Sequence, residues 1–357
     1  MKVELESSLF SQAIKTCATL MGAEVDVLLT AVESGFLRIE AGANSSYVYN
    51  TLPAKVAAKG RVVIPIQRLI GLPLREELKL TASSSELSFK TGSFTGTLKA
   101  SSDVDRVIAQ RPLKKFKPTV HVPTEVFKDA LSRVSLGSSL PGAQLGVRVQ
   151  VGEDLTLSTT DQYRAVIYKD ELALAQTELD VLLHPDFLHG AMSKILSPEV
   201  GMGVHKGVFH LSTDTVSIYH PSIQQQPEDI EDWMDNGIDY SKKECTVTVS
   251  CDRLSKNIRE VSAVQLGSLA YDTHFDLLIK GQLAHLRCKS DHGSTKSSVE
   301  LFRSNATKTI TKLSSKYTLE MLHLIRAGDS DISFWSDFIL LEGHEGKFRG
   351  LIPTVAA

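Results

Sequence analysis

The sequence predicts an α+β fold of three similar domains, each with two helices packed on antiparallel β-sheets. Short helical patterns recur roughly every 60 residues, as expected of a repeated structural unit. Between them, apolar and polar residues alternate in the way typical of half-buried strands. After every second helix the same order follows: a strand, a turn and two more strands. A chain of 357 residues can hold two or three such domains.

Six segments carry apolar residues at the spacing of one helix face. The first places Phe10, Ala13 and Cys17 on one stripe. The second opens with Pro65, which suits a first helical turn. We expect helices at residues 7–20, 65–74, 123–134, 185–196, 251–262 and 316–325.

The strands that follow the second, fourth and sixth helices occupy equivalent places in the repeat. We expect them within residues 78–98, 200–219 and 331–352. Pairing the six helical units therefore gives three domains, 1–116, 117–240 and 241–357. The link 111–118 has the proline and charge of a connector. The exit of the second domain, residues 224–240, is polar and acidic and holds Trp233.

Composition is that of an ordinary globular protein, with 42% hydrophobic and 23% charged residues and a net charge of −3. No apolar run approaches the ~18 residues of a membrane-spanning helix. The N-terminal residues alternate like a strand and carry acids, unlike a signal peptide. The cysteines form no Cys-x-x-Cys pair, which favours free thiols in a reducing cytoplasm.

The sequence lacks the motifs of common catalytic sites. Gly-x-Ser-x-Gly and the phosphate-binding Gly-x-x-x-x-Gly-Lys-Ser/Thr are missing, and no histidines show the helical i, i+4 pairing of a metalloprotease. The acidic run 228–232 could suggest a cation site, but we interpret it as a solvated connector. We therefore predict no catalytic residue, no metal and no cofactor.

The stretch 155–167 predicts a β-hairpin. Leu155, Leu157 and Thr159 alternate with polar residues, Thr160-Asp161-Gln162 has turn chemistry, and a more buried strand runs from Tyr163 to Tyr168. This strand, Thr-Asp-x-x-Arg turn and strand, with residues 181–185 leading into the next helix, resembles the middle domain of the bacterial or phage-type sliding clamp. That clamp is the β subunit of the replicative DNA polymerase, its processivity factor.

The resemblance extends over all 357 residues in element order and is closest over residues 154–196. It implies the DNA clamp fold and a ring of two chains around duplex DNA that tethers the DNA polymerase without catalysis of its own. The implied partners are double-stranded DNA without sequence preference, a DNA polymerase, a clamp loader and a second copy as a homodimer, with no membrane. The implied location is the cytoplasm, at the nucleoid, or the host cytoplasm for a phage-encoded protein.

In the family, partner peptides dock in an apolar groove between the second and third domains. Tyr163 stands where the family usually has His, and Val355 where it has Arg. Leu351 and Ile352 fit a plain core strand equally well. The matching positions are Thr160, Tyr163, Arg164, Ala165, Pro227, Ile230, Leu351, Ile352, Pro353, Thr354 and Val355.

The family lines its ring with the six helices, which hold DNA by diffuse attraction to phosphates. Counted with the last segment extended to residue 327, these helices carry ten basic and six acidic residues, a net +4 that leaves −7 on the rest of the chain. For any one residue, simple exposure to water is an equal alternative. The predicted DNA-contacting residues are Lys15, Arg68, Lys128, Arg133, Lys194, Arg253, Lys256, Arg259, Lys316 and Arg326.

The family closes its ring by joining an edge strand of the first domain to one of the third. By analogy we expect residues 95–98 with Leu69 and Ile70 to meet residues 264–269 of a second copy. The residues chosen are Leu69, Ile70, Leu98, Val264 and Leu266. Two alternatives stay open: a clamp-like protein that does not close a ring and binds or competes for clamp partners, and an enzyme with an unrecognised site on a repeated scaffold.

Overall fold

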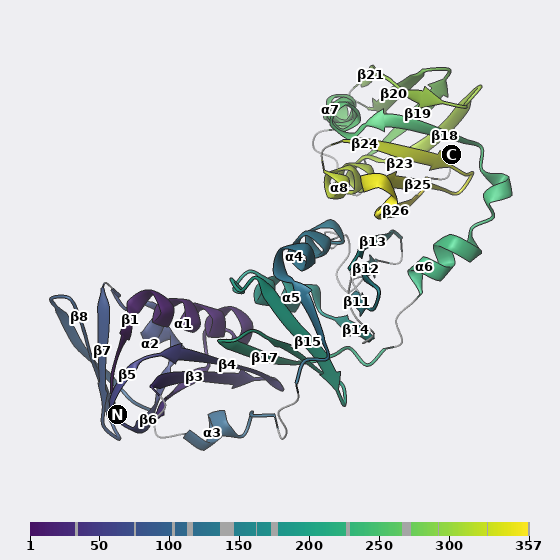
Figure 1. Cartoon of the computed structure of the whole chain (residues 1–357). Coiled ribbons are helices and arrows are strands. Elements are labelled where there is room, and N and C mark those ends of the chain that lie inside the picture. The colour runs from purple at the N-terminus through teal and green to yellow at the C-terminus, as the bar shows by residue number, and fades with distance from the viewer. Residues whose placement is uncertain are drawn as a thin grey trace. The chain divides into compact units, whose positions relative to one another are not determined.

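The chain is described by a computed structural model (Figure 1), which divides into two compact units. Unit 1 comprises Met1–Lys128 and Thr177–Gln224, and unit 2 comprises Asp129–Gln176 and Gln225–Ala357. The structure describes residues 1–32, 35–74, 76–101, 104–112, 117–135, 146–161, 163–172, 178–225, 229–265, 273–291, 293–326 and 328–355.

Unit 1 is built from antiparallel sheets and short helices. A five-stranded sheet has the order β5-β1-β7-β8-β9, and an eight-stranded sheet the order β10-β15-β16-β17-β4-β3-β2-β6. The strands are β1 (Lys2–Glu6), β2 (Asp26–Val32), β3 (Phe36–Ala43), β4 (Ser46–Pro53), β5 (Lys55–Ala58), β6 (Gly60–Pro65), β7 (Glu77–Ala82), β8 (Glu86–Thr91), β9 (Phe94–Lys99), β10 (Val120–Pro123), β14 (Leu179–Leu183), β15 (Glu199–His205), β16 (Val208–Ser212) and β17 (Val216–Pro221). The helices are α1 (Ser7–Met21), α2 (Ile66–Ile70), α3 (Val104–Ile108), α5 (Pro185–Met192) and the start of α4 (Thr124–Arg133).

Helix α1 shows why its segment is helical. Phe10, Ala13, Ile14, Cys17 and Met21 recur at helical spacing, and all are buried. This stripe packs on β3 and β4, and α1 also contacts α2 and α5. The apolar residues that recur at helical spacing in the sequence are therefore the residues that enter the core.

The eight-stranded sheet joins segments that are distant in the sequence. Strand β17 pairs with β4, with Ile218 opposite Val48 and Tyr219 opposite Tyr47. Because this pairing crosses the predicted boundary at residue 116, a compact unit does not end there. The three-domain scheme stays a prediction.

Unit 2 is also built from antiparallel sheets. One runs in the order β11-β12-β13-β26-β25-β24-β18-β22 and the other in the order β21-β20-β19-β23. The strands are β11 (Val147–Val151), β12 (Asp154–Thr160), β13 (Ala165–Glu171), β18 (Cys245–Ser250), β19 (His274–Lys280), β20 (Leu283–Ser290), β21 (Gly293–Glu300), β22 (Arg303–Ser304), β23 (Thr309–Ser314), β24 (Asp329–Phe334), β25 (Phe338–Gly343) and β26 (Phe348–Pro353). The helical segments are the end of α4, α6 (Ile230–Asp232), η1 (Trp233–Gly237), η2 (Tyr240–Lys242), α7 (Cys251–Ser262), η3 (Ala263–Gln265), α8 (Ser315–Ile325) and η4 (His344–Gly346).

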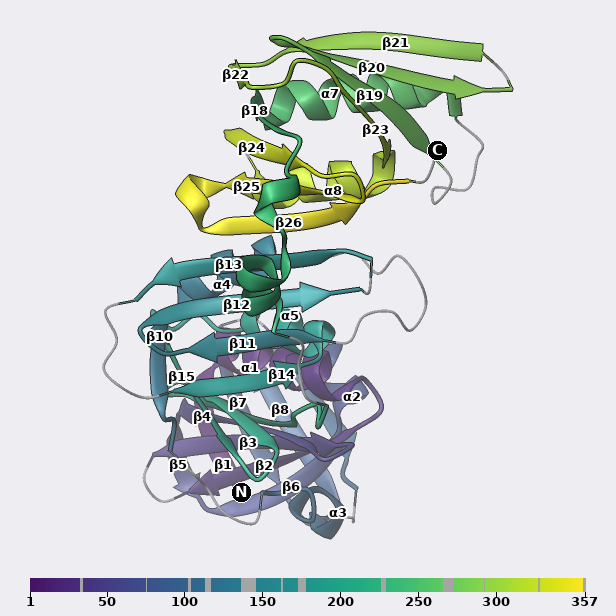
Figure 2. The ribbon, with the colours of Figure 1, turned by 90° about the vertical axis from the view of Figure 1, so that its right-hand side faces the viewer.

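A second long-range pairing, between β13 and β26, builds the larger sheet of unit 2. Ala165 to Tyr168 pair antiparallel with Leu351 to Phe348, and Figure 2 shows β13 beside β26. The segment α6 lies against β13 in the same view. This β13–β26 pairing, which we call the seam, places the hairpin of residues 155–167 next to the C-terminal strand.

The six predicted helices are confirmed as elements, as is the α+β class with antiparallel sheets. Besides the short turns η2, η3 and η4, two further helical segments were not predicted. Helix α3 packs Val107 on Leu28 and Val63, and α6 with η1 forms inside the acidic segment that was interpreted as a solvated connector. No helix among the described residues is long and apolar enough to cross a membrane.

Candidate functional site

The turn between β12 and β13 is closed by the aspartate and the arginine of the Thr-Asp-x-x-Arg motif. Asp161 Oδ1 accepts hydrogen bonds from the backbone amides of Tyr163 (3.1 Å) and Arg164 (2.8 Å). Arg164 donates from Nε (2.9 Å) and Nη2 (2.6 Å) to Asp161 Oδ2. The strand predicted to start at Tyr163 therefore begins at Ala165, because these bonds hold the preceding residues in the turn.

Arg164 also links the hairpin to helix α8. Its side chain is 0% exposed, it pairs with Glu320, and its guanidinium lies 4.3 Å from the ring centre of Tyr317. Burial alone would lower the pKa of Arg164, but the hydrogen bonds to Asp161 and Glu320 outweigh it and the pKa is raised. The motif arginine is thus a fully engaged internal cation, and its charge is not offered at the surface.

Residues 229–240, which we call the strap, lie across the sheet beside this hairpin. Ile230, Met234 and Ile238 follow one another at helical spacing and are all buried. They pack in one cluster that also holds Ala165, Ile167, Trp335, Leu340 and Leu351. Apolar burial, which contributes about 2 kcal/mol for each large side chain, therefore fixes the strap in place.

Ion pairs connect the strap to three strands of the sheet. Asp229 pairs with Arg148 on β11 (3.4 Å) and Glu231 with Lys169 on β13 (3.2 Å). Asp235 pairs with Arg349 on β26. Asp229 also caps α6, because its side chain accepts from the backbone amide of Asp232 at 2.9 Å. The acidic run thus has partners in the fold.

The hairpin, the strap and β26 together form a groove of about 460 Å³. Its apolar floor is made of buried side chains, while Tyr163 (49% exposed) and Trp233 (44% exposed) stand at its edge. The groove is lined by Thr160, Tyr163, Arg164, Ala165, Asp229, Ile230, Trp233 and Leu351. A concave apolar floor with a few polar groups fits a ligand with large apolar side chains.

The structure brings six of the predicted groove residues together: Thr160, Tyr163, Arg164, Ala165, Ile230 and Leu351. Sequence reasoning missed Asp229 and Trp233 as lining residues, although a tryptophan in a polar segment is itself an unusual signal. Ile352 departs from the prediction, because it is fully buried opposite Ile339.

The last predicted groove residues lie elsewhere. Pro353 ends β26 opposite Phe338. Thr354 and Val355 line a separate hollow of about 640 Å³, with Ile310 and Lys312 of β23. The backbone amide of Val355 donates to the carbonyl of Lys312 at 2.9 Å, which fixes the tail there. Pro227 lies outside the described residues.

The ten predicted DNA-contacting residues differ in their surroundings. Arg133 is 8% exposed and is engaged by Asp129 (2.7 Å), the carbonyl of Ile325 and His344. That prediction is corrected, because the Arg133 guanidinium is used inside unit 2. Arg326 pairs with Asp129 at 2.9 Å but keeps half of its side chain exposed. Lys128, Lys194 and Lys316 are half-buried.

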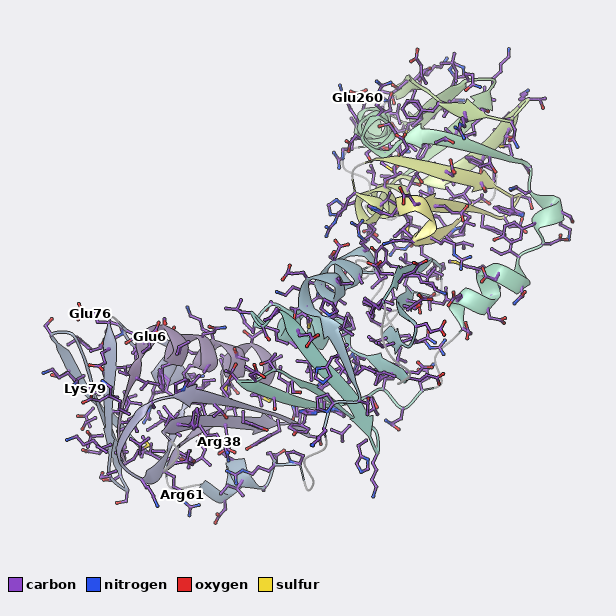
Figure 3. All side chains as sticks on the ribbon, viewed as in Figure 1. Glu6, Arg38, Arg61, Glu76, Lys79 and Glu260 are labelled. Atoms are coloured by element: carbon purple, nitrogen blue, oxygen red, sulfur yellow. The ribbon has the colours of Figure 1, made fainter. Side chains whose placement is uncertain are left out.

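The exposed basic residues are concentrated on α7. Its apolar face, with Leu254, Ile258 and Val261, is buried. Arg253, Lys256 and Arg259 are exposed on the same helix, as are the acids Asp252 and Glu260 (Figure 3), and the Glu260 carboxylate lies 3.9 Å from the Lys256 ammonium group. Lys15 on α1 and Arg68 on α2 are the exposed bases of unit 1 in the predicted set. A solvent-facing basic helix is suited to non-specific phosphate contact.

Of the two predicted edge segments, residues 95–98 lie on strand β9, whereas the described part of the other segment, Val264 and Gln265, belongs to η3. Strand β9 ends the five-stranded sheet, and β21 ends the four-stranded sheet of unit 2. Near β9, Ile70 (44%) and Phe94 (47%) are exposed and Leu98 is half-buried. Leu69 is corrected to a core residue, because it is 1% exposed.

In unit 2, the predicted interface residue Val264 belongs to η3 and not to a strand. Its carbonyl accepts a hydrogen bond from Ser290 beside the start of β21. Leu266 lies outside the described residues.

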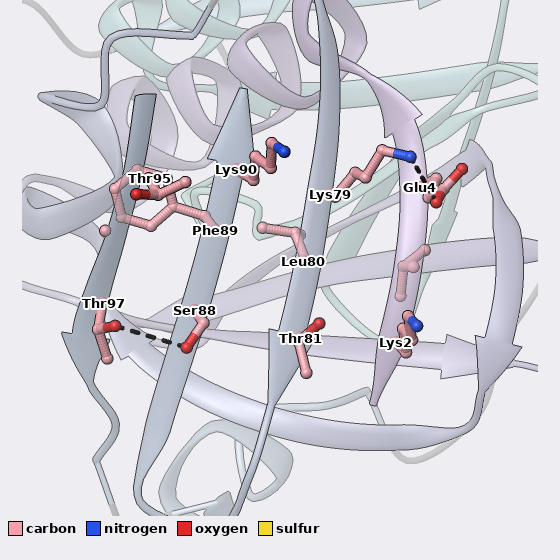
Figure 4. A pocket seen from close by; sticks show the side chains of 12 residues that line it. Lys2, Glu4, Lys79, Leu80, Thr81, Ser88, Phe89, Lys90, Thr95 and Thr97 are labelled. Atoms are coloured by element: carbon pink, nitrogen blue, oxygen red, sulfur yellow. Dashed lines mark hydrogen bonds and ion pairs between the residues drawn. The ribbon is translucent and has the colours of Figure 1, made fainter. Parts of the chain in front are cut away.

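A polar hollow of about 470 Å³ lies on the five-stranded sheet (Figure 4). Its charged groups include Lys79 and Glu4, which form an ion pair at 2.8 Å, and Ser88 lies 3.5 Å from Thr97 across the strands. These are ordinary cross-strand pairs. Within the described part of the chain, no cluster of three or more histidine, cysteine or acidic residues could hold a metal ion.

The architecture and the groove together define the fold of the bacterial DNA polymerase sliding clamps. Solved structures match the chain over 100% of its length. The β subunit of the DNA polymerase of Streptococcus pyogenes is 16% identical, with a TM-score of 0.86 over 100% of that chain. The DNA polymerase III β subunit of Thermotoga maritima is 15% identical, with a TM-score of 0.84 over 99% of that chain.

The DNA polymerase sliding clamp of Bacillus subtilis is 12% identical, with a TM-score of 0.85 over 99% of that chain. At this level of identity the likeness shows a shared fold, and it confirms the predicted resemblance. No protein-family model matches the chain, and no curated protein sequence does either.

Proposed function

We propose that this chain is a DNA sliding clamp, a non-catalytic ring that encircles duplex DNA and tethers a DNA polymerase. The observation that supports it most is the full-length match to sliding-clamp structures, with TM-scores of 0.84 to 0.86. A match over part of the chain would be compatible with many roles of a shared domain, whereas a clamp needs every part of its ring.

The groove supports a second part of the proposal, the binding of partner peptides. Short linear segments bind through one or two large side chains that enter an apolar pocket. Ala165, Ile230 and Leu351 provide such a floor, and Tyr163 and Trp233 can close over a bound side chain. The expected ligands are segments of a DNA polymerase and of a clamp loader.

The basic face of α7 supports the proposed contact with DNA. A clamp must hold DNA and still slide, so its contacts should be to phosphates and without sequence preference. Arg253, Lys256 and Arg259 are long, exposed cations on a rigid helix. Lys15, Arg68 and Arg326 are proposed to add to the same diffuse attraction.

Two exposed sheet edges support closure by a second copy. Among the described strands, β9 ends its sheet and carries the apolar side chains of Phe94 and Leu98, and Ile70 lies exposed on α2. Strand β21 offers an edge in unit 2. We propose that β9 of one copy pairs with β21 of another, as exposed edges readily do.

The test combines mass in solution with retention on DNA. Light scattering on a size-exclusion column should give twice the 39.1 kDa of one chain. The protein, loaded by an opening factor, should stay on nicked circular DNA and leave the same DNA after linearisation, because a ring is held by topology. Equal retention on both forms would contradict a ring. A monomer that binds partner peptides but is not retained would instead indicate a clamp-like protein that competes for clamp partners.

A further inference from the structure

All the charged residues of the strap beside the groove are acidic. Residues 229–240 contain Asp229, Glu231, Asp232, Asp235 and Asp239 and no lysine or arginine. Four of these acids pair with bases, Asp229 with Arg148, Glu231 with Lys169, Asp235 with Arg349 and Asp239 with Lys242, so those bases are occupied within the fold. The balance of charge along this wall is therefore negative.

The opposite wall does not compensate this charge. Among the described residues that line the groove, the one cation is Arg164, whose side chain is 0% exposed. Arg164 faces two carboxylates, those of Asp161 and Glu320, so the cluster of these three groups carries a net negative charge. The hairpin side of the groove therefore offers no net positive charge, while Asp229 lines the strap side.

Asp229 is the charged group that is best placed to contact a ligand. It lines the groove, and its side chain is 55% exposed, whereas that of Arg148 is 12% exposed. The backbone amide of Asp232 contributes most to lowering the pKa of Asp229, and the charge of Arg148 lowers it further. The Asp229 carboxylate therefore stays ionised at neutral pH and presents its charge to solvent.

We infer that the groove selects a basic linear peptide, one in which lysine or arginine flanks the apolar anchor side chain. This inference rests on the proposed peptide-binding function and adds the charge class of the partner. The apolar floor holds the anchor, while Asp229 and the acids of the strap attract the flanking cations. Charge of this kind acts mainly on selectivity between partners and on the rate of association.

The probe is a set of fluorescein-labelled peptides with one shared Leu-Phe core and paired lysines, glutamines or glutamates on its flanks. Fluorescence anisotropy with the full chain gives each Kd. We expect the lysine peptide to bind tightest and the glutamate peptide weakest, with about a three- to tenfold difference between the two. The difference should shrink at about 0.5 M salt, where the Debye length falls to a few ångströms.

Two variants identify the groups responsible. Asp229→Asn keeps an N-cap on α6 and should reduce the lysine preference about two- to threefold. The matched control is Glu153→Gln, which removes an exposed carboxylate from the turn at the other end of β12 and should leave the preference unchanged. Trp233→Ala should weaken all three peptides, because it removes the edge of the groove itself.

The outcomes separate this inference from the proposed function. If the glutamate peptide binds as tightly as the lysine peptide while Trp233→Ala weakens both, the inferred selection for a basic peptide is wrong, but peptide binding in the groove is supported. A lysine preference that Asp229→Asn leaves intact would also overturn the assignment. If no peptide binds, or if Trp233→Ala has no effect, the peptide-binding function fails, and the inference fails with it.

Discussion

Replacing Arg164 by methionine tests whether this arginine holds the groove together from inside. Its guanidinium makes two hydrogen bonds to Asp161, pairs with Glu320 and lies over the ring of Tyr317. Methionine keeps most of the volume but leaves the Asp161 carboxylate, 1% exposed, without its counter-ion. Breaking one partner of a buried pair costs about 3–5 kcal/mol of the free energy of unfolding.

The assay can follow unit 2 by itself. The two tryptophans of the chain, Trp233 and Trp335, lie beside or within the apolar cluster under the strap. Tryptophan emission during urea unfolding therefore reports on unit 2, which matters because a chain with two compact units need not unfold in one step. We expect Arg164→Met to unfold with a midpoint at a lower urea concentration than the parent chain.

A double-mutant cycle with Glu320→Gln distinguishes the ion pair from lost packing. If the pair is real, Glu320→Gln should cost about 1 kcal/mol in the parent chain and close to nothing beside Arg164→Met. A loss below about 1 kcal/mol for Arg164→Met, or additive effects in the double variant, would refute this reasoning.

Three further predictions follow from the other surfaces. Replacing Arg253 and Lys256 of α7 by glutamine should make the slope of log K against log salt concentration, for double-stranded DNA binding, shallower by about 0.9 per residue replaced, with no change in sequence preference. An unchanged slope in a salt titration would show that α7 does not contact DNA. Phe94→Glu places a charge on the β9 edge and should shift the light-scattering mass from two chains to one; an intact dimer would exclude this edge from the interface. Burial lowers the pKa of His210 from 6.5 to about 4. As pH falls below 6.5, the unfolded chain therefore binds a proton at His210 before the folded chain does. The free energy of unfolding should then decrease by about 3 kcal/mol between pH 6.5 and pH 4. His210→Phe should flatten this loss in urea titrations across that pH range, and an equally steep loss in the variant would contradict it.

The helices could be predicted because the apolar residues that recur at helical spacing are the residues that the fold buries. In α7, Leu254, Ile258 and Val261 are buried at the spacing read from the sequence. The strap was missed for the opposite reason. Ile230 and Met234 follow the same spacing, but they stand among acids whose basic partners come from β11, β13 and β26, strands far away in the chain.

Side-chain direction also set a limit to sequence reasoning. Leu69 and Ile70 are neighbours of similar chemistry, yet one is buried and the other exposed, which a five-residue helix does not reveal by its pattern. Arg133 looked like any exposed base of an amphipathic helix. Asp129 is its i,i+4 neighbour on the same helix, but its other partners, the carbonyl of Ile325 and the ring of His344, become close only in the folded unit.

The seam between β13 and β26 gives the groove a mechanical property. Ala165 and Leu351, which line the groove, are themselves a cross-strand pair, and the pairing continues to Tyr168 and Phe348. A partner bound in the groove, as proposed, would therefore pull on a hydrogen-bonded sheet and not on a free loop. Under tension along the strands these hydrogen bonds are loaded together in shear, since they run perpendicular to the strand direction. If the groove binds a partner as proposed, that attachment point would be held by several cross-strand hydrogen bonds at once.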